Sequence, residues 1–246
     1  RVRHSVAGGG SLPGRTFIKE GNSMNRNGIA LDGPAGAGKS TLAKMVAQRL
    51  KRPYVDTGAM YRAMAYACKQ THTDIEDEPA VAALLKELDI RVNYLSDGQH
   101  VWVNGNDVTG YLRTEEMGKG ASLVSKLPCV RDRLAGLQRD IAHETGAVLD
   151  GREIGTFVIP ETPHKFFITA DPRERARRRL LQLEAKGETG DFDTILRDIE
   201  ARDYQDSHRA YAPLKQAEDA VLIDTTHLTA EEAAEQITSA VLAKEV

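Results

Sequence analysis

Hydrophobic positions follow two different periods along the chain, and their alternation predicts the main elements. Most short apolar runs of the kind found in buried strands are followed by segments in which apolar residues return every three or four positions, as on one face of a helix. Strands are expected at 28–32, 53–55, 147–150, 165–169 and 220–224. Helices are expected around 42–50, 60–67, 81–88, 114–126, 128–144, 172–186, 195–199 and from 229. This order predicts an α/β fold, in which helices sandwich a parallel sheet.

One stretch departs from this alternation. Residues 90–94 and 100–104 alternate with period two on either side of Ser96-Asp97-Gly98, which predicts an antiparallel hairpin, and 104–107 reads as a second turn. We therefore expect a small antiparallel insert over about 89–112 that binds a substrate.

A phosphate-binding loop separates the first expected strand from the first expected helix. Its sequence, Gly33-Pro34-Ala35-Gly36-Ala37-Gly38-Lys39-Ser40, fits the pattern GxxxxGK[ST] throughout. The glycines let backbone N–H groups curl around phosphate oxygens, and the helix that follows points the positive end of its dipole at the same oxygens. Lys39 is expected to neutralise the β- and γ-phosphates of ATP, Ser40 to ligate Mg²⁺, and Thr41 to complete the nucleotide-binding loop.

The loop alone leaves the acceptor of the phosphate open. The NKxD motif by which GTPases recognise their base is absent, and the strand that ends at Asp150 continues with Gly151-Arg152 instead of the Asp-Glu pair common in motor ATPases. Two classes remain: an enzyme that phosphorylates a small acceptor, and a protein that binds nucleotide as a regulatory or assembly module.

Composition and charge restrict the partners. The 246 residues carry a formal net charge of −3, which gives no electrostatic case for binding a nucleic-acid duplex. No apolar run approaches the roughly 20 residues that a membrane span requires, and Cys68 and Cys129 fit no metal-ligand spacing. The glycine-rich residues 1–23 lack the apolar centre of a signal peptide, so we expect a disordered leader or tag before one domain over 24–246. A cytoplasmic protein with small-molecule partners, and with neither nucleic acid nor membrane, is expected.

Five short motifs then occur in order along the chain. They are Asp32-Gly33-Pro34, Asp56-Thr57-Gly58-Ala59-Met60-Tyr61-Arg62, Asp150-Gly151-Arg152-Glu153-Ile154-Gly155-Thr156, Arg202-Asp203-Tyr204-Gln205-Asp206-Ser207-His208-Arg209 and Ala212-Pro213-Leu214. Together, over about 27–242, they resemble bacterial-type cytidylate kinase, a nucleoside monophosphate kinase family of P-loop proteins. The resemblance implies Mg²⁺-dependent transfer of the γ-phosphate of ATP to CMP or dCMP in pyrimidine metabolism, by a monomer.

The resemblance also implies roles for residues of the acceptor site. Thr57 and Arg62 are similar to the pair that receives the CMP phosphate, and Arg152 to a further arginine for that phosphate. Ser122 and Arg131 are similar to the residues that contact the cytosine edge. Several arginines in one cleft suit phosphoryl transfer, because a planar guanidinium binds phosphate oxygens in bidentate fashion.

Further roles concern the sugar, the metal and the transferring phosphate. Arg202 and Asp206 resemble the ribose and sugar-phosphate contacts, and Arg209 lies close to the transferring phosphates in the family. Asp150 resembles the carboxylate that holds Mg²⁺ through water. The residues expected to be catalytic are Lys39, Asp150, Arg152, Arg178, Arg179 and Arg209.

A cluster of arginines from 175 to 179 allows two interpretations. It fits a solvated charged helix, and it fits the short helical lid over about 172–192 that the resemblance implies, which would close over ATP. Arg178 and Arg179 are the better candidates for the lid, and Gly187 and Gly190 flank the turn that would flex.

Two acidic residues need separate treatment: Glu153 departs from the family motif, and Asp32 allows two interpretations. The family usually has Gly-Arg-Asp where this chain has Gly-Arg-Glu, so Glu153 is expected to accept a hydrogen bond from the cytosine 4-amino group with a longer side chain. Asp32 follows the first strand, where it fits either the water shell of Mg²⁺ or the cap of a turn.

Overall fold

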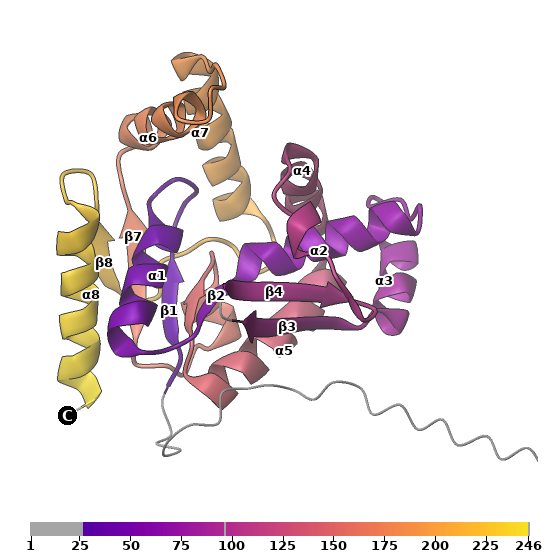
Figure 1. Ribbon diagram of the computed structural model, residues 1–246, viewed down its shortest axis with the longest axis horizontal. Coiled ribbons are helices and arrows are strands. Elements are labelled where there is room, and N and C mark those ends of the chain that lie inside the picture. The colour runs from indigo at the N-terminus through magenta and orange to yellow at the C-terminus, as the bar shows by residue number, and fades with distance from the viewer. Residues whose placement is uncertain (1–26, 96, 246) are drawn as a thin grey trace, which may run out of the picture.

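The computed structural model describes residues 27–95 and 97–245, and a five-stranded parallel sheet lies at its centre (Figure 1). The strands lie in the order β2 (Tyr54–Asp56), β6 (Val148–Asp150), β1 (Ile29–Asp32), β7 (Lys165–Thr169) and β8 (Val221–Asp224). All neighbouring pairs are parallel, and Asp150 at the end of β6 is in register with Asp56 on one side and Leu31 on the other. The predicted α/β fold is confirmed, and the carboxyl ends of the central strands meet at one edge.

Each face of the sheet belongs to its own hydrophobic core. In β1, Ile29 and Leu31 pack with α1 (Lys39–Leu50) and α8 (Ala230–Glu245), whereas Ala30 belongs to the opposite core. Successive side chains of a strand point to opposite faces, so a short, wholly apolar strand can supply both cores. The helices of the opposite core are α2 (Thr57–Gln70), α3 (Glu78–Glu87), α4 (Glu115–Val124) and α5 (Pro128–Thr145).

Side-chain caps explain where several helices begin. An Asp or Thr side chain accepts a hydrogen bond from a backbone N–H in the first turn and satisfies a donor that the helix itself leaves free. These caps are Asp56 for α2, Asp77 for α3, Thr114 for α4, Asp171 for α6 (Pro172–Glu184) and Asp191 for α7 (Phe192–His208). Helices α6 and α7 pack together and form a lobe beyond the carboxyl ends of the strands (Figure 1).

A second, antiparallel sheet consists of β3 (Ile90–Leu95), β4 (Gly98–Val103) and β5 (Asn106–Asp107) and packs on α2. The predicted hairpin is confirmed, and Gly98 adopts a φ of 130° that suits glycine at its turn. The predicted second turn is also confirmed: Asn104 and Gly105 form it, and Asn106 and Asp107 continue from it as a short third strand that pairs with Val103 and Trp102. A 3₁₀ turn, Thr109–Tyr111, follows.

The remaining expectations concern the segment 1–23 and membrane-spanning helices. The leader or tag expected over 1–23 lies outside the described residues. In the part that is described, no helix is long and apolar enough to cross a membrane.

Candidate active site

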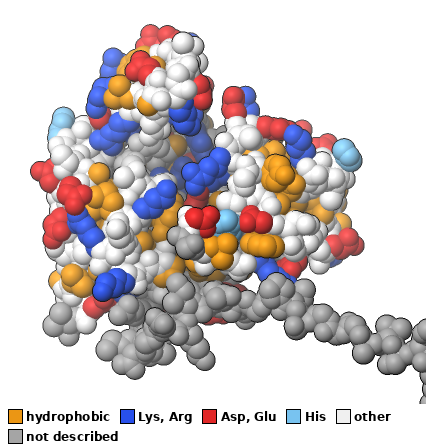
Figure 2. Space-filling model, in the orientation of Figure 1, with side chains coloured by type: hydrophobic (Ala, Val, Ile, Leu, Met, Phe, Trp, Pro, Cys, Tyr) orange, Lys and Arg blue, Asp and Glu red, His pale blue; other side chains and the backbone are white. Residues whose placement is uncertain are grey.

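A cavity of about 950 Å³ opens at the carboxyl edge of the parallel sheet. Lys and Arg side chains gather around this hollow, beneath the α6–α7 lobe (Figure 2). The predicted residues that line it are Ala35, Gly36, Ala37, Gly38, Lys39, Ser40, Thr41, Thr57, Arg62, Ser122, Arg131, Asp150, Arg152, Glu153, Arg178, Arg202, Asp206 and Arg209. Those that do not line it are Gly33, Pro34 and Arg179. Residues from distant parts of the sequence therefore share one cavity.

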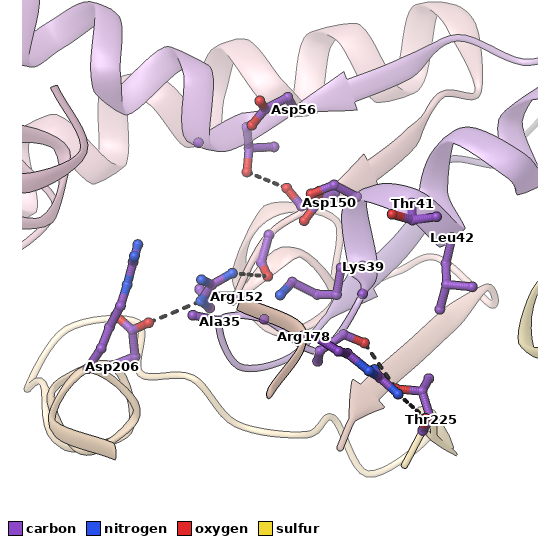
Figure 3. Close-up of a pocket in the computed structure, with 18 of the residues that line it drawn as sticks. Ala35, Lys39, Thr41, Leu42, Asp56, Asp150, Arg152, Arg178, Asp206 and Thr225 are labelled. Atoms are coloured by element: carbon purple, nitrogen blue, oxygen red, sulfur yellow. Dashed lines mark hydrogen bonds and ion pairs between the residues drawn. The ribbon is translucent and has the colours of Figure 1, made fainter. Parts of the chain in front are cut away.

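The glycine-rich loop has the backbone that the motif predicts. Gly33 has a φ of 145°, and a Cβ there would lie 1.9 Å from the carbonyl oxygen of Ile168, so no other residue fits. Lys39 is 5 % exposed, and its Nζ donates to the carbonyl oxygen of Pro34 at 2.7 Å. Burial, helped by the nearby charge of Arg152, lowers the pKa of Lys39 to about 7. Lys39 and Arg152 lie side by side at the cavity (Figure 3).

Ser40 and Asp150, the two predicted Mg²⁺ ligands, are in contact. Ser40 Oγ donates to Asp150 Oδ2 at 2.5 Å, and the Tyr54 hydroxyl donates to the same oxygen at 3.2 Å. Burial and the neighbouring Asp150 carboxylate raise the pKa of Tyr54 well above its usual range, so Tyr54 stays a neutral donor. One hydroxyl and one carboxylate beside open space fit Mg²⁺, which usually keeps water and substrate phosphates as its other ligands.

Asp32 acts as a cap. Its two carboxylate oxygens accept from the backbone N–H groups of Ile154 and Gly155 at 2.8 and 2.7 Å. These groups begin a π-helical turn, η2 (Ile154–Val158), a rare form that is frequent at functional sites. Burial raises the pKa of Asp32 to about 7. Of the two interpretations, the structure supports the cap, although the capped segment lies far along the chain.

The predicted acceptor residues also line the cavity. Thr57 Oγ1 donates to the backbone oxygen of Asp150 at 2.6 Å, which ties the start of α2 to the end of β6. Arg152 Nε donates to Asp206 Oδ2 at 3.0 Å, so β6 and α7 are joined across the cavity (Figure 3). Arg62 Nε is buried and, within the described residues, has no hydrogen-bond partner. This part of the cavity thus presents cationic groups with donors still available.

Glu153 lies at the centre of an ion-pair cluster. Its carboxylate contacts Arg131 Nη1 through one oxygen and Arg209 Nη2, at 2.9 Å, through the other. Tyr61 also donates its hydroxyl proton to Glu153, at 3.3 Å. Glu153 is 5 % exposed and Arg131 is 2 % exposed, so both charges are compensated within the protein. The expected contact of Glu153 with cytosine stays a prediction, and any such contact would be made by an already paired carboxylate.

The arginines of α6 have different surroundings. Arg178 lines the cavity and donates to the Thr225 backbone oxygen at 2.5 Å, at the end of β8 (Figure 3). Arg179 is exposed and lies outside the cavity lining, so its predicted catalytic role is not explained by this conformation. Arg175 is buried and bonds to the Ala35 carbonyl oxygen of the glycine-rich loop at 3.0 Å and to Asp203 of α7 at 2.6 Å. The α6–α7 lobe is thereby anchored to the loop.

Sequence reasoning assigned no role to Tyr61, Gln99 or Thr225, and it placed Arg175 only within the arginine cluster of the predicted lid. Arg175 offered a signal, because it precedes Arg178 by three positions and so shares a helix face with it. Gln99 and Thr225 offered none, since their partners lie 43 and 47 positions away.

Comparison with known proteins agrees with this geometry. A family model described as cytidylate kinase matches residues 29–243. A cytidylate kinase of Geobacillus sp. strain WCH70 is 48 % identical over 209 residues, which cover 85 % of this chain and 93 % of that protein. A cytidylate kinase of Bacillus subtilis strain 168 is 46 % identical over 213 residues, covering 87 % of this chain and 95 % of that protein.

Among solved structures, an uncharacterized protein from Eubacterium ventriosum ATCC 27560 is similar in fold, with a TM-score of 0.50 and 13 % identity over 89 % of this chain and 99 % of that one. The fold, the cavity and the family match lead to the same conclusion: this chain belongs to the cytidylate kinase family.

Proposed function

We propose that this protein transfers the γ-phosphate of ATP to CMP or dCMP, giving ADP and CDP or dCDP. The observation that carries the proposal is that one cavity is lined both by a glycine-rich phosphate loop and by a cluster of arginines. A protein that only senses nucleotide needs one phosphate site, whereas a kinase needs two that face each other. The curated relatives bear the name of this activity.

ATP would bind between the glycine-rich loop and the segment 225–230, both of which line the cavity. The loop backbone and Lys39 would hold its phosphates, and Arg178 would contact it from α6. Phosphoryl transfer depends mainly on alignment and on neutralising the charge that spreads over the transferring group. Lys39, Arg152 and Arg209 are the groups that supply positive charge between the two phosphate sites.

CMP would bind at the cluster of arginines. Its phosphate would be held by Thr57, Arg62 and Arg152, and Arg62 Nε, which has no partner among the described residues, offers a donor for it. Arg202 and Asp206 would contact the sugar. Ser122, Arg131 and Glu153 would contact the base, in the part of the cavity between α4 and α5. A phosphate oxygen of CMP would attack the γ-phosphate of ATP directly, so no side chain of the enzyme is needed as a nucleophile.

Ser40 and Asp150 would hold Mg²⁺, which when bound would neutralise phosphate charge. The contact between Ser40 Oγ and Asp150 Oδ2 supports this assignment, because it places two oxygen ligands together beside the phosphate loop. We assign Asp32 to the cap of the turn at Ile154 and Gly155, because each of its oxygens accepts from one of those backbone N–H groups.

The test is an assay of ADP release with CMP, dCMP, UMP, AMP and shikimate as acceptors. We expect CMP and dCMP to be the best acceptors and activity to require Mg²⁺. If ATP binds but no acceptor is phosphorylated, the protein is a nucleotide-binding module. If AMP or shikimate is preferred, the acceptor assignment is wrong.

We further propose that the protein acts as a cytoplasmic monomer on small molecules alone. The formal net charge of −3 supports the exclusion of nucleic acid as a partner. Light scattering of the purified protein tests the oligomeric state, and a mass twice that of the chain would contradict the proposal.

A further inference from the structure

The end of β2 is completed by a side chain from the antiparallel insert. Strand β2 is an edge strand of the parallel sheet, so one of its sides has no neighbouring strand. At Asp56 the carboxamide of Gln99 takes that place: its Oε1 accepts from the Asp56 backbone N–H at 2.7 Å, and its Nε2 donates to the Asp56 backbone oxygen at 3.1 Å. Gln99 thus pairs with β2 as a peptide group of one more strand would.

Asp56 transmits this position to the predicted acceptor site. Its Oδ1 caps α2 through the Ala59 N–H at 3.0 Å, and its Oδ2 accepts from Arg62 Nη2 at 2.7 Å. The Asp56 and Arg62 side chains both pack closely against Gly58, since a Cβ on Gly58 would lie 3.2 Å from Asp56 Oδ1 and 3.3 Å from Arg62 Nη1. One side of the Arg62 guanidinium is therefore fixed by Asp56, while its Nε has no partner among the described residues.

Gln99 itself does not line the cavity, and neither does any other described residue of the insert between 89 and 112. Its effect on the acceptor must therefore pass through Asp56. We propose that Gln99 is a positioning residue that orients Arg62 for the phosphate of the acceptor nucleotide. This inference rests on the proposed function, and it assigns to the insert a supporting role in place of direct contact.

The neighbouring residue provides a matched control. His100 projects from the opposite face of β4, and its ring bonds to Asp97 at 2.9 Å and to Asp107 at 2.6 Å, both within the insert. Removing His100 perturbs the insert and leaves the Gln99–Asp56 contact in place.

The decisive variant is Gln99→Met, which keeps the length of the side chain and removes both hydrogen bonds. We expect its KM for CMP to rise about tenfold while its KM for ATP stays within about twofold, because two hydrogen bonds at one site are lost. His100→Ala should change both constants by less than about twofold. Equal increases in the two variants would mean that the insert acts only through its general stability, and an unchanged KM for CMP in Gln99→Met would overturn the inference.

A double-mutant cycle identifies the route. If Gln99 acts through Arg62, Gln99→Met should add less than about a twofold loss of kcat/KM for CMP in an Arg62→Ala background, because coupled residues are not additive. If Gln99→Met lowers kcat/KM for CMP as much in the Arg62→Ala background as in the wild type, Gln99 does not act through Arg62 and the inference is wrong.

Hydrogen exchange separates this contact from the activity. The Asp56 amide donates to Gln99, so its exchange should become faster in Gln99→Met and stay unchanged in His100→Ala. If the wild-type protein does not phosphorylate CMP, the proposed function fails while the exchange result still decides whether Gln99 holds Asp56. If exchange at Asp56 is unaltered in Gln99→Met, the inference fails even in an active enzyme.

Discussion

Ser40 Oγ donates a hydrogen bond of 2.5 Å to Asp150 Oδ2, across 110 positions of the sequence. The contact joins the second residue of α1 to the last residue of β6, the strand next to β1 in the sheet. It arises because parallel strands end at the same edge, where the glycine-rich loop also turns into its helix. A hydroxyl and a carboxylate are thereby held in contact before any phosphate is present.

The first prediction concerns this pair. Asp150→Asn keeps the shape of the side chain and removes its charge, so we expect the Mg²⁺ concentration for half-maximal activity to rise and kcat to fall by about two orders of magnitude. Ser40→Ala should also raise the Mg²⁺ concentration for half-maximal activity. Activity titrated with Mg²⁺ at fixed ATP is the measurement, and Tyr54→Phe, which removes only the outer hydrogen bond, is the control. An unchanged Mg²⁺ requirement in Asp150→Asn would remove Asp150 from the metal site.

Lys39 gives the second prediction. Lys39→Ala removes a positive charge beside the β- and γ-phosphates, and we expect kcat to fall by roughly two orders of magnitude or more while the fold is kept. Within the described part of the chain the side chain makes one hydrogen bond, to the Pro34 carbonyl oxygen, so its removal should leave the circular dichroism spectrum unchanged. Near-normal turnover in the folded variant would contradict the assignment of the phosphate loop.

The third prediction follows from the charge state of Lys39. Its pKa is lowered to about 7 by burial, so without nucleotide the side chain is mostly neutral above that pH. Bound phosphates favour the charged form, which means that ATP binding must take up a proton there and that affinity should fall as pH rises from about 7 to about 9. Calorimetry at pH 8 in two buffers with different ionisation enthalpies measures the uptake. In Lys39→Met the buffer dependence should disappear, and its absence in the wild type would refute the lowered pKa.

The two neighbouring arginines of α6 give the fourth prediction. Arg178 lines the cavity and is held at Thr225, whereas Arg179 is exposed and does not line it. We expect Arg178→Ala to raise KM for ATP by about tenfold, as the loss of a charged contact to phosphate would. Arg179→Ala tests the predicted lid: a fall in kcat without a change in ATP affinity would support a contact made only after closure, and wild-type kinetics would exclude Arg179 from catalysis.

Sequence patterns predicted the strands, the helices and the phosphate loop, because each depends on local periodicity or on a contiguous motif. The resemblance to a known family placed Arg62 and Arg152 in one site, which agrees with the meeting of the carboxyl ends of parallel strands there. Neither the patterns nor the resemblance could predict which side chains orient those arginines. Asp56 is held by Gln99, and Ala35 by Arg175, through single contacts between segments far apart in the chain. The contact of Gln99 with Asp56 leaves no period and no spacing in the sequence, and the spacing of Arg175 from Arg178 indicates a shared helix face but not the contact with Ala35. The pairing of Glu153 with two arginines was hidden for the same reason.

Glu153 gives the last prediction, which concerns the choice between CMP and UMP. A carboxylate that accepts from the cytosine 4-amino group faces a carbonyl in UMP, and two acceptors repel each other, so CMP should be preferred. In Glu153→Gln the amide can donate to the uracil carbonyl, and we expect the ratio of kcat/KM for CMP over UMP to fall. Glu153→Asp keeps the charge on a shorter arm and should preserve or sharpen the ratio.

The ratio, and not the absolute rate, is the informative quantity for Glu153. The carboxylate also compensates the charges of Arg131 and Arg209, so Glu153→Gln should weaken those ion pairs and lower turnover with any acceptor. Arg209 contacts Glu153 and Asp206, and Glu153→Gln disturbs only the first of these contacts, so enough order should remain for rates to be measured. A uniform loss for CMP and UMP, with their ratio unchanged, would mean that Glu153 only organises the arginines and that Ser122 and Arg131 distinguish the base.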